Sequence, residues 1–461
     1  MTSVFALWKN DGVDFPEDFD LKGMKALFQS IDEAFNYLNT KKNQMKFGLE
    51  RMEWMLARLD HPERRLKFIH IAGTNGKGST AAMIASVLAE AGYDTGLYAS
   101  PYITKWNDEI QVNGQPISDE SFLHWLNHLL PFVQEMEEQG LEPPSYYELK
   151  TLIAICYFAH EVYPDFVVWE TLLGGRLDAT NVVYPIVSVI TQIGKDHQEL
   201  LGDTIAEITK EKAAIIKPGV PVVSSARDPE AQQVIKQEAA QKKAALYQID
   251  QDFQVQLKQR SRTIQEFDFS NVFRSIPNLS IRLLGQHQLD NAATAVMTLE
   301  VLRQFYAALI EDDQLYQGLV KTTWPGRFEL VNDKPLILLD VAHNLDGVKM
   351  LSATLKELYT YDRLILLTAM MRDKEVELML RELLPLADEV VATQVADQER
   401  SLSAEEISQK VKELQPQKKV QHFSKAAEAV QYATSIQKEG DLLLITGSLY
   451  LIAEIRHFFV K

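Results

Sequence analysis

The segment "FIHIAGTNGKGSTAAMIASVL", residues 68 to 88, joins a short apolar run, a glycine-rich loop and a second apolar pattern. The run at 68–71 is typical of a strand inside a parallel sheet, because both faces of such a strand are covered. A helical period then follows at Ala81, Ile84, Ala85 and Leu88. The segment therefore predicts a strand, a tight turn and a helix, which is the repeating unit of a doubly wound α/β fold.

The loop in this segment is predicted to bind phosphate. Its glycines allow a sharp turn and a close approach of a ligand, and a helix N-terminus favours an anion through free N–H groups and its dipole. Lys77 adds a positive charge, and the hydroxyls after it lie where a phosphate-bound Mg²⁺ would be. The strict P-loop pattern has a glycine at the position of Ile71, so the alternative is a tight turn with a solvated lysine. The candidate residues are Gly73, Thr74, Asn75, Gly76, Lys77, Gly78, Ser79 and Thr80.

Composition limits the kinds of partner. The chain has 461 residues, enough for two or three domains, and a formal net charge of −17. That charge argues against broad binding to nucleic acid or to an anionic membrane, so an anionic substrate needs a locally basic site. The single cysteine, Cys156, excludes an internal disulfide, and the first residues lack a signal-peptide pattern. With no apolar stretch long enough for a bilayer, we expect a cytoplasmic protein.

The rest of the chain predicts two α/β domains. Residues 20–60 are helical in pattern, and apolar strands then alternate with helices up to a Pro-Gly break in "KTTWPGRFEL". After the break the alternation starts again. We predict a P-loop-type, doubly wound, mostly parallel sheet domain with an N-terminal helical segment (1–325), followed by a smaller Rossmann-like α/β domain (326–461).

Polar residues follow several of these strands. Glu170 ends the strand "DFVVWE" and resembles a Walker-B acid that holds Mg²⁺, although a strand-end carboxylate can also simply face solvent. Other polar groups after apolar strands are Arg176 and Asp178, Asp196 and His197, and Asp340, His343 and Asn344. Ligands of such sheets bind at the carboxyl ends of the strands, so we expect a site in a cleft between the two domains.

The ordered motifs resemble one known family. They are "IAGTNGKGST", "ASPYI", "WETLLGGRLDATN", "TQIGKDH", "EKAAIIKPG", "GQHQLDNAATA", "TWPGRFE" and "LDVAHNLDG". From about residue 48 to the C-terminus the chain resembles the folylpolyglutamate synthase and dihydrofolate synthase family of the Mur ligase superfamily. The resemblance implies a cytoplasmic, ATP-dependent amide ligase. ATP would phosphorylate a folate carboxylate, and the amine of L-glutamate would displace the phosphate to give an amide.

The resemblance also implies a role for each metal-site residue. Lys77 and the loop backbone would bind the ATP phosphates. Ser100 and Glu170 would hold one Mg²⁺, and His197 would hold a second together with a modified Lys212. Such a site is needed because several anionic groups meet at the transferred phosphate, and Lys77 and metal ions offset their repulsion.

The remaining roles concern the nucleotide and the second domain. By resemblance, Asn291 lies on the adenine side, and Arg327 and Asp340 lie near the nucleotide. Asp340 and His343 would come from the second domain to the reaction centre. The structural alternatives are that Asn291 caps the helix beginning at "LDNAATAV" and that Arg327 is a surface charge in a linker.

Lys212 is predicted to face inward. A capping-box pattern at Thr204 and Glu207 starts a helix, Pro218-Gly219 ends it, and Lys212 shares the face of its isoleucines. A buried ammonium is costly unless it is paired or neutral, so the alternatives are an ion pair, for example with Glu170, or a neutral amine. The resemblance implies the second, with the amine carbamylated by CO₂ to give an oxygen ligand for Mg²⁺.

Two stretches depart from the family pattern. One is "ETLLGG", where Thr171 and Leu172 stand in place of the valine and glycine that the resemblance implies after the acid. The other contains Glu109. Glu109 in "NDEI" stands where the resemblance implies an arginine that meets a substrate carboxylate, and a glutamate would repel that group. Lys105 and Arg176 are the candidate compensating cations. The favoured function is a folate–glutamate ligase, with a dihydropteroate–glutamate ligase or a bifunctional enzyme as the alternative. More distant alternatives are a cell-wall Mur ligase and a P-loop GTPase switch. We expect a monomer acting on ATP, L-glutamate and folate or dihydropteroate.

Overall fold

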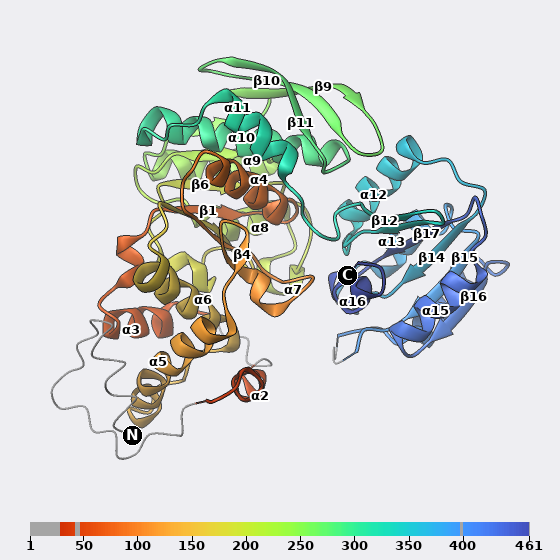
Figure 1. The fold of residues 1–461 in the computed structure, drawn as a ribbon, viewed down its shortest axis with the longest axis horizontal. Coiled ribbons are helices and arrows are strands. Elements are labelled where there is room, and N and C mark those ends of the chain that lie inside the picture. The colour runs from red at the N-terminus through yellow and green to blue at the C-terminus, as the bar shows by residue number, and fades with distance from the viewer. Residues whose placement is uncertain (1–27, 42–46, 397–399, 461) are drawn as a thin grey trace.

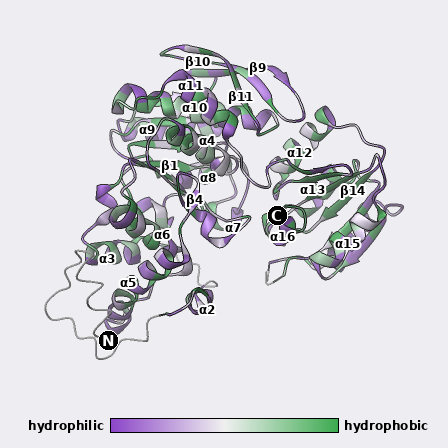
Figure 2. Cartoon of the chain, viewed as in Figure 1, coloured by the Kyte–Doolittle hydropathy of each residue, from purple (hydrophilic) through white to green (hydrophobic). Residues whose placement is uncertain are grey.

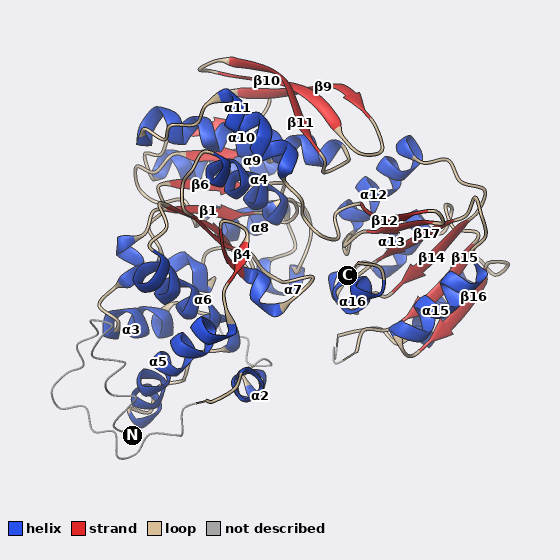
Figure 3. Cartoon of the chain, in the orientation of Figure 1, coloured by secondary structure: helices blue, strands red, loops and turns tan. Residues whose placement is uncertain are grey.

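Two sheets flanked by helices lie side by side, and a smaller sheet packs against the first of them (Figure 1). The computed structural model describes residues 28–41, 47–396 and 400–460. Helices cover both faces of each large sheet (Figure 3), and the strands are predominantly apolar (Figure 2). The predicted α/β class with two parallel-rich sheets is confirmed.

The first sheet has eight strands in the order β4-β3-β2-β5-β1-β6-β7-β8. Strand β3 pairs antiparallel with both β2 and β4, and all the other neighbours pair parallel. Central β1 is buried along its whole length because β5 and β6 flank it and helices cover it. Every strand expected from the apolar runs is present. The strands are β1 (Phe68–Ala72), β2 (Thr95–Tyr98), β3 (Ile110–Val112), β4 (Gln115–Pro116), β5 (Phe166–Glu170), β6 (Val187–Ile190), β7 (Val222–Ser224) and β8 (Leu246–Gln248).

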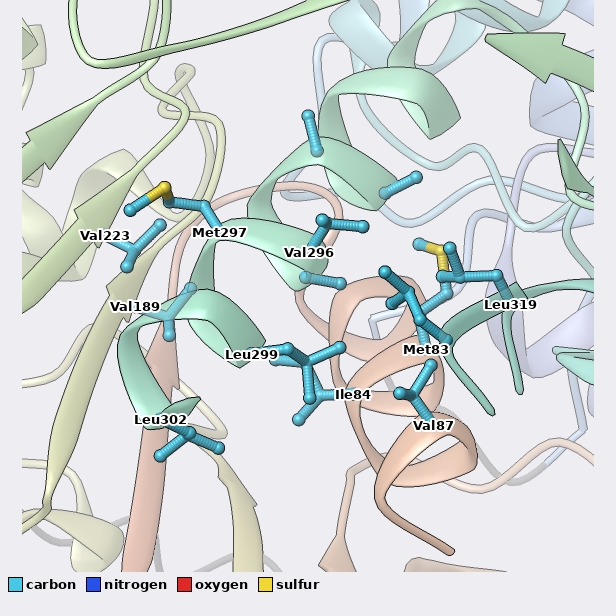
Figure 4. Packing of buried hydrophobic residues seen from close by; sticks show 14 of the residues in the cluster. Met83, Ile84, Val87, Val189, Val223, Val296, Met297, Leu299, Leu302 and Leu319 are labelled. Carbon is cyan, nitrogen blue, oxygen red and sulfur yellow. The ribbon is translucent and has the colours of Figure 1, made fainter. Parts of the chain in front are cut away.

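The helix after the loop lies in the centre of this domain. It is α4 (Lys77–Glu90), and it packs against α10 (Gln286–Tyr306) and α11 (Asp312–Lys321). Met83, Ile84 and Val87 of α4 meet Val296 and Leu299 of α10 (Figure 4). Since these side chains are fully buried, they fix the direction of α4 and so the position of its N-terminal loop.

A second layer of helices covers the face of the sheet opposite to α4, where it packs against Phe68, Val167 and Trp169. Its helices are α2 (Ile31–Thr40), α3 (Glu50–Arg58), α5 (Asp119–Glu138) and α6 (Tyr146–Tyr157). The helical pattern expected over 20–60 is thus present as two helices, while residues 20–27 and 42–46 lie outside the described part of the chain. No helix among the described residues is long and apolar enough to span a membrane.

A three-stranded antiparallel sheet was not predicted. Its strands are β9 (Phe253–Arg260), β10 (Gln265–Asn271) and β11 (Ser275–Ile281). Burial alternates along β9 and β10, with Phe253, Phe267 and Phe269 facing the core of the first domain. The polar outward residues between these aromatics interrupt the continuous apolar runs that indicate the other strands.

The second large sheet has six strands in the order β12-β13-β17-β14-β15-β16, with only β12 antiparallel. Its strands are β12 (Glu329–Asp333), β13 (Leu336–Leu339), β14 (Leu364–Thr368), β15 (Glu389–Thr393), β16 (Lys419–Phe423) and β17 (Leu442–Thr446). Its helices are α12 (Leu345–Leu358), α13 (Val376–Leu383), α14 (Ala404–Leu414), α15 (Ala426–Ile436) and α16 (Leu449–Ile455). Because its strands run parallel, their carboxyl ends gather loop residues at one edge.

Candidate functional site

The loop between β1 and α4 has the backbone geometry that its glycines predict. Gly76 has φ +91° and is the N-cap of α4. A Cβ atom there would lie 2.2 Å from Asn291 Oδ1, so only glycine fits at this position. Ser79 and Thr80 are buried in the first turn, and Thr80 Oγ1 has no hydrogen-bond partner. The loop thus leads into the N-terminus of α4, which is where the sequence predicts a phosphate-binding site.

Two lysines meet at the start of the loop. Lys77 Nζ donates to the carbonyl oxygen of Gly73 at 3.1 Å, and Lys212 Nζ donates to the same oxygen at 3.0 Å. Lys77 Nζ also lies 4.0 Å from Glu170 Oε1. The structure thus brings together three of the predicted catalytic residues at the carboxyl end of β1 and β5.

Glu170 is a buried carboxyl group close to Lys77. Burial raises its pKa to about 7, and the opposing effects of Lys77, of Arg327 and of the Ser100 N–H do not cancel that rise. Ser100 therefore lies beside Glu170, as predicted for a shared metal. A divalent ion at this place would favour the charged carboxylate and remove the cost of burying it.

Lys212 is buried, as predicted, and its partner differs from the one in the ion-pair alternative. It binds a backbone carbonyl and not Glu170. Burial lowers its pKa to about 7, and Lys77 lowers it further in the same direction. The capping box at Thr204 and Glu207 is present.

The helix that carries Lys212 is shorter than the sequence predicted. It is α8 (Ile205–Ala213) and does not continue to Pro218. The Glu211 carbonyl accepts from the Arg176 N–H at 2.8 Å, which draws that carbonyl away from the helix. The turn of residues 174–176 therefore replaces the last helical turn.

Residues of both sheets meet at the loop. Asn75 and Asn344 exchange side-chain hydrogen bonds of 3.3 Å and 3.1 Å. Asn344 also donates to Asp196 Oδ2 at 3.3 Å, and His343 Nε2 lies 3.5 Å from the same oxygen. The carboxyl end of β13 is thereby placed against the phosphate loop, as the predicted cleft requires.

His197 has different neighbours from the predicted ones. Its Nε2 lies 3.9 Å from Asp196 Oδ1 and 3.5 Å from Lys374 Nζ, and Lys374 donates to Asp196 at 2.5 Å. Burial lowers the pKa of His197 to about 4, with Asp196 opposing. The neutral imidazole can bind a metal, although no direct contact of His197 with Lys212 is present among the described residues.

Asn291 and Arg327 are the two residues predicted to contact the nucleotide. Asn291 is inside α10, five residues after its start at Gln286, so the helix-cap alternative is wrong. Arg327 is partly exposed, yet its Nε is buried without a partner. Burial lowers the pKa of Arg327, while Asp340 and Glu170 oppose that shift, so the surface-linker alternative is also wrong.

Asp340 is held rigidly by backbone donors. Its carboxylate accepts from the N–H groups of Phe328 and Ala342, both at 2.8 Å. Burial raises its pKa against those hydrogen bonds and the nearby Arg327. His343, three residues on, donates through Nδ1 to the carbonyl oxygen of Val341 at 2.9 Å. Both predicted residues of the second sheet therefore have fixed orientations.

Neither Lys105 nor Arg176, the candidate compensating cations, pairs with Glu109 among the described residues. Arg176 binds Glu211 at 3.0 Å and is exposed, and Lys105 is also exposed. The cation that faces Glu109 is Lys150 of α6, which forms a buried ion pair with it. The interval of 41 residues between the two carries no local signal, so only the fold brings them together.

A cavity of about 1050 Å³ extends between the two large domains. One end has Asp196, His197, Asn344 and Lys374, beside the phosphate loop. The other end has Tyr102, Glu109, Tyr146, Tyr147, Lys150 and Arg400. Sequence reasoning missed Lys374 and Lys150 and gave no role to Asp196 and Asn344. Lys374 could have been found, since "MRDKE" directly follows the strand at 364–368.

The described residues contain no group of three or more His, Cys, Asp or Glu side chains arranged to hold a metal ion. Neither predicted set could form such a group, because each has only one such side chain, Glu170 or His197, with Ser100 or Lys212 as its companion. The second set thus depends on converting Lys212 to an anionic ligand.

The fold and the site define a two-domain ATP-dependent ligase. The Mur ligase middle domain matches residues 71–299, and the Mur ligase glutamate ligase domain matches residues 326–449. A dihydrofolate synthase/folylpolyglutamate synthase of Bacillus subtilis is 39% identical over 93% of this chain and 99% of its own length. A folylpolyglutamate synthase of Lacticaseibacillus casei is 32% identical over 92% and 97%.

Solved structures agree with these relatives. Mycobacterium tuberculosis folylpolyglutamate synthase complexed with ADP has a TM-score of 0.87 and 28% identity, over 94% of this chain and 98% of that one. A folylpolyglutamate synthase of Thermotoga maritima has a TM-score of 0.81 and 32% identity, over 94% and 97%. The chain belongs to the folylpolyglutamate synthase and dihydrofolate synthase family of Mur ligases.

Proposed function

We propose that this chain joins L-glutamate to the carboxylate of a folate, using ATP, as a cytoplasmic monomer. Residues 1–325 bind ATP and residues 326–461 form the second ligase domain. The observation that carries the proposal is the pair Asn75–Asn344, which places the phosphate loop against the edge of the second sheet and beside the shared cavity. An acceptor in that cavity has its carboxylate near a nucleotide on the loop.

The residues in and around the loop have separate roles in the reaction. Lys77 and the N–H groups of residues 73–80 bind the phosphates, and Gly76 leaves space for Asn291 on the nucleotide side. Arg327 and Asp340 lie between the nucleotide and the second sheet. His343 and Asp340 orient the reacting groups from that sheet. Bound Mg²⁺ would offset the charge that develops during phosphoryl transfer.

We assign one metal position to each of two pairs of donors. Ser100 and Glu170 hold one Mg²⁺, which suits a carboxylate whose pKa burial has raised to about 7. His197 and Lys212 hold the second, with Lys212 carbamylated. The lysine suits this reaction because burial lowers its pKa to about 7, and the neutral amine is the form that reacts with CO₂.

The second candidate is ligation of L-glutamate to dihydropteroate, alone or as an additional activity. The relative from Bacillus subtilis carries both names, and so does one from Escherichia coli that is 29% identical over 90% of this chain. The aromatic end of the cavity, with Tyr102, Tyr146 and Tyr147, suits a flat heteroaromatic ring in either acceptor.

One assay separates the candidates. Phosphate release from Mg-ATP is measured with L-glutamate and, in turn, a reduced folate, dihydropteroate and a cell-wall precursor. Glutamate-dependent release with the reduced folate supports the first proposal, and release with dihydropteroate alone supports the second. Release with the cell-wall precursor only would overturn both.

A further inference from the structure

A buried ion pair forms part of the wall at the aromatic end of the cavity. Glu109 ends η3 (Trp106–Glu109) and is 2% exposed, while Lys150 of α6 is 4% exposed. The Lys150 ammonium and the Glu109 carboxylate are in direct contact. Apolar residues of the same size are often no less stabilising than a buried pair, so stability alone does not explain this one.

The Glu109 carboxylate is held by further donors. Its Oε1 accepts from the Tyr102 N–H at 3.1 Å and from Ser100 Oγ at 3.3 Å, while Oε2 faces Lys150. Both oxygens are therefore engaged, and the carboxylate cannot turn away from the ammonium. The hydrogen bond from Ser100 Oγ also connects this pair, at the acceptor end of the cavity, with a residue that we propose as a metal ligand.

The ammonium lies among aromatic rings. Lys150 Nζ is 4.9 Å from the ring centroid of Tyr146 and 5.9 Å from that of Tyr147. Both rings line the cavity with it. A substrate carboxylate near these rings would bind the same ammonium and would compete with Glu109 for its three N–H groups.

Two other cations along the cavity are paired as well. Lys374 donates to Asp196 at 2.5 Å, and Arg400 lies 3.2 Å from Asp373. A paired cation attracts a distant anion much less than a single charge does, because the fields of the two partners largely cancel. An acceptor with many carboxylates therefore gains little from these two cations, and Lys195 is the exposed cation of the lining outside such pairs among the described residues.

We propose that Glu109 occupies on Lys150 the place that an additional acceptor carboxylate would take. The pair then sets acceptor choice: the cavity favours acceptors with few carboxylates, such as a pteroate or a monoglutamyl folate, over polyglutamyl chains. This inference rests on the proposed function and names the acceptor class of that same site.

The experiment compares kcat/KM for triglutamyl and monoglutamyl reduced folates. In Glu109→Gln the ratio of triglutamyl to monoglutamyl should rise roughly tenfold, because Lys150 becomes available to the substrate. The matched control is Glu454→Gln, which removes a carboxylate lining the same cavity that accepts from Ala396 N and does not contact Lys150. An equal rise in both variants would assign the effect to total charge and overturn the inference.

A double variant protects the test against misfolding. Glu109→Gln combined with Lys150→Gln leaves no uncompensated buried charge, and it should return the ratio to within about twofold of the unaltered chain. A ratio that stays raised roughly tenfold in the double variant overturns the role of Lys150, even where the single variant fails to fold.

The two proposals fail in different ways. If the unaltered chain turns over no folate or pteroate, the proposed function fails and this inference fails with it. If turnover occurs and the ratio in a folded Glu109→Gln equals that of the unaltered chain, only the inference fails.

Discussion

Lys77 and Lys212 donate to one acceptor, the carbonyl oxygen of Gly73, at 3.1 Å and 3.0 Å. Two ammonium groups at one oxygen repel each other, and burial together with that repulsion lowers the pKa of Lys212 to about 7. A phosphate on the loop would draw Lys77 toward itself. The arrangement thus links nucleotide binding to the protonation of the lysine that we propose is carbamylated.

Replacing Lys77 with alanine should lower kcat by roughly a hundredfold or more, since this ammonium acts on phosphate charge in a site that excludes water. Thermal stability should change little, because the core of α4 is apolar. The assay is phosphate release at saturating Mg-ATP. Lys321→Ala, which removes an exposed partner of Glu90, is the control and should keep full activity. Normal turnover in Lys77→Ala would rule out its phosphate role.

Replacing Lys212 with alanine should remove most activity, and short carboxylic acids should restore part of it by supplying the missing oxygen ligand. The control is Lys210→Ala on the same helix, because Lys210 is exposed and should be neither impaired nor rescued. The measurement is turnover against acetate or propionate concentration. Full activity of Lys212→Ala without added acid, or equal rescue of both variants, would contradict the carbamate.

The sequence predicted the parts of the fold that depend on local pattern. Buried parallel strands such as β1, β5 and β6 are continuous apolar runs, so they were visible, and the loop after β1 was visible from its glycines and Lys77. The parallel edge strands β8 and β16 were missed, because they are less buried. Strand ends also placed Glu170, Asp340 and His343 correctly at one edge of each sheet. These features need only neighbours in the chain.

Contacts between distant segments could not be predicted. Asn75 meets Asn344 across 269 residues, and Lys150 meets Glu109 across 41. The charge at Glu109 appeared repulsive only because its partner lies on another helix. The early end of α8 likewise depends on a hydrogen bond from Arg176, which belongs to a different loop. Packing brings such partners together, and no periodicity in the sequence predicts them.

A methyl group at Gly76 tests the nucleotide side of the loop. In Gly76→Ala the new Cβ meets Asn291 Oδ1, so KM for Mg-ATP should rise roughly tenfold. Gly92→Ala is the matched control, because Gly92 also has a positive φ, +86°, but has nothing within 4 Å of a Cβ atom. Both variants should lose about 1 kcal/mol of stability from backbone strain. An unchanged KM in Gly76→Ala would place the nucleotide elsewhere.

The free energy of unfolding should depend on pH in part because of His70. This residue of β1 is fully buried, its Nε2 bonds Thr180 Oγ1 at 3.0 Å, and its Nδ1 has no partner. Burial, with a smaller effect from Lys217, lowers its pKa to about 3. Between pH 6.5 and 3 the unfolded chain therefore binds a proton that the folded chain does not.

Because the unfolded state binds more protons in that window, the free energy of unfolding falls as pH falls. From pH 6.5 to 4.5 the contribution of His70 should be a loss of about 2 kcal/mol. Urea unfolding at both pH values should therefore show a loss smaller by that amount in His70→Gln than in the unaltered chain. His422→Gln, at an exposed position on β16, is the control and should match the unaltered chain. Equal losses in His70→Gln and the unaltered chain would mean that His70 takes up its proton in the folded state as well.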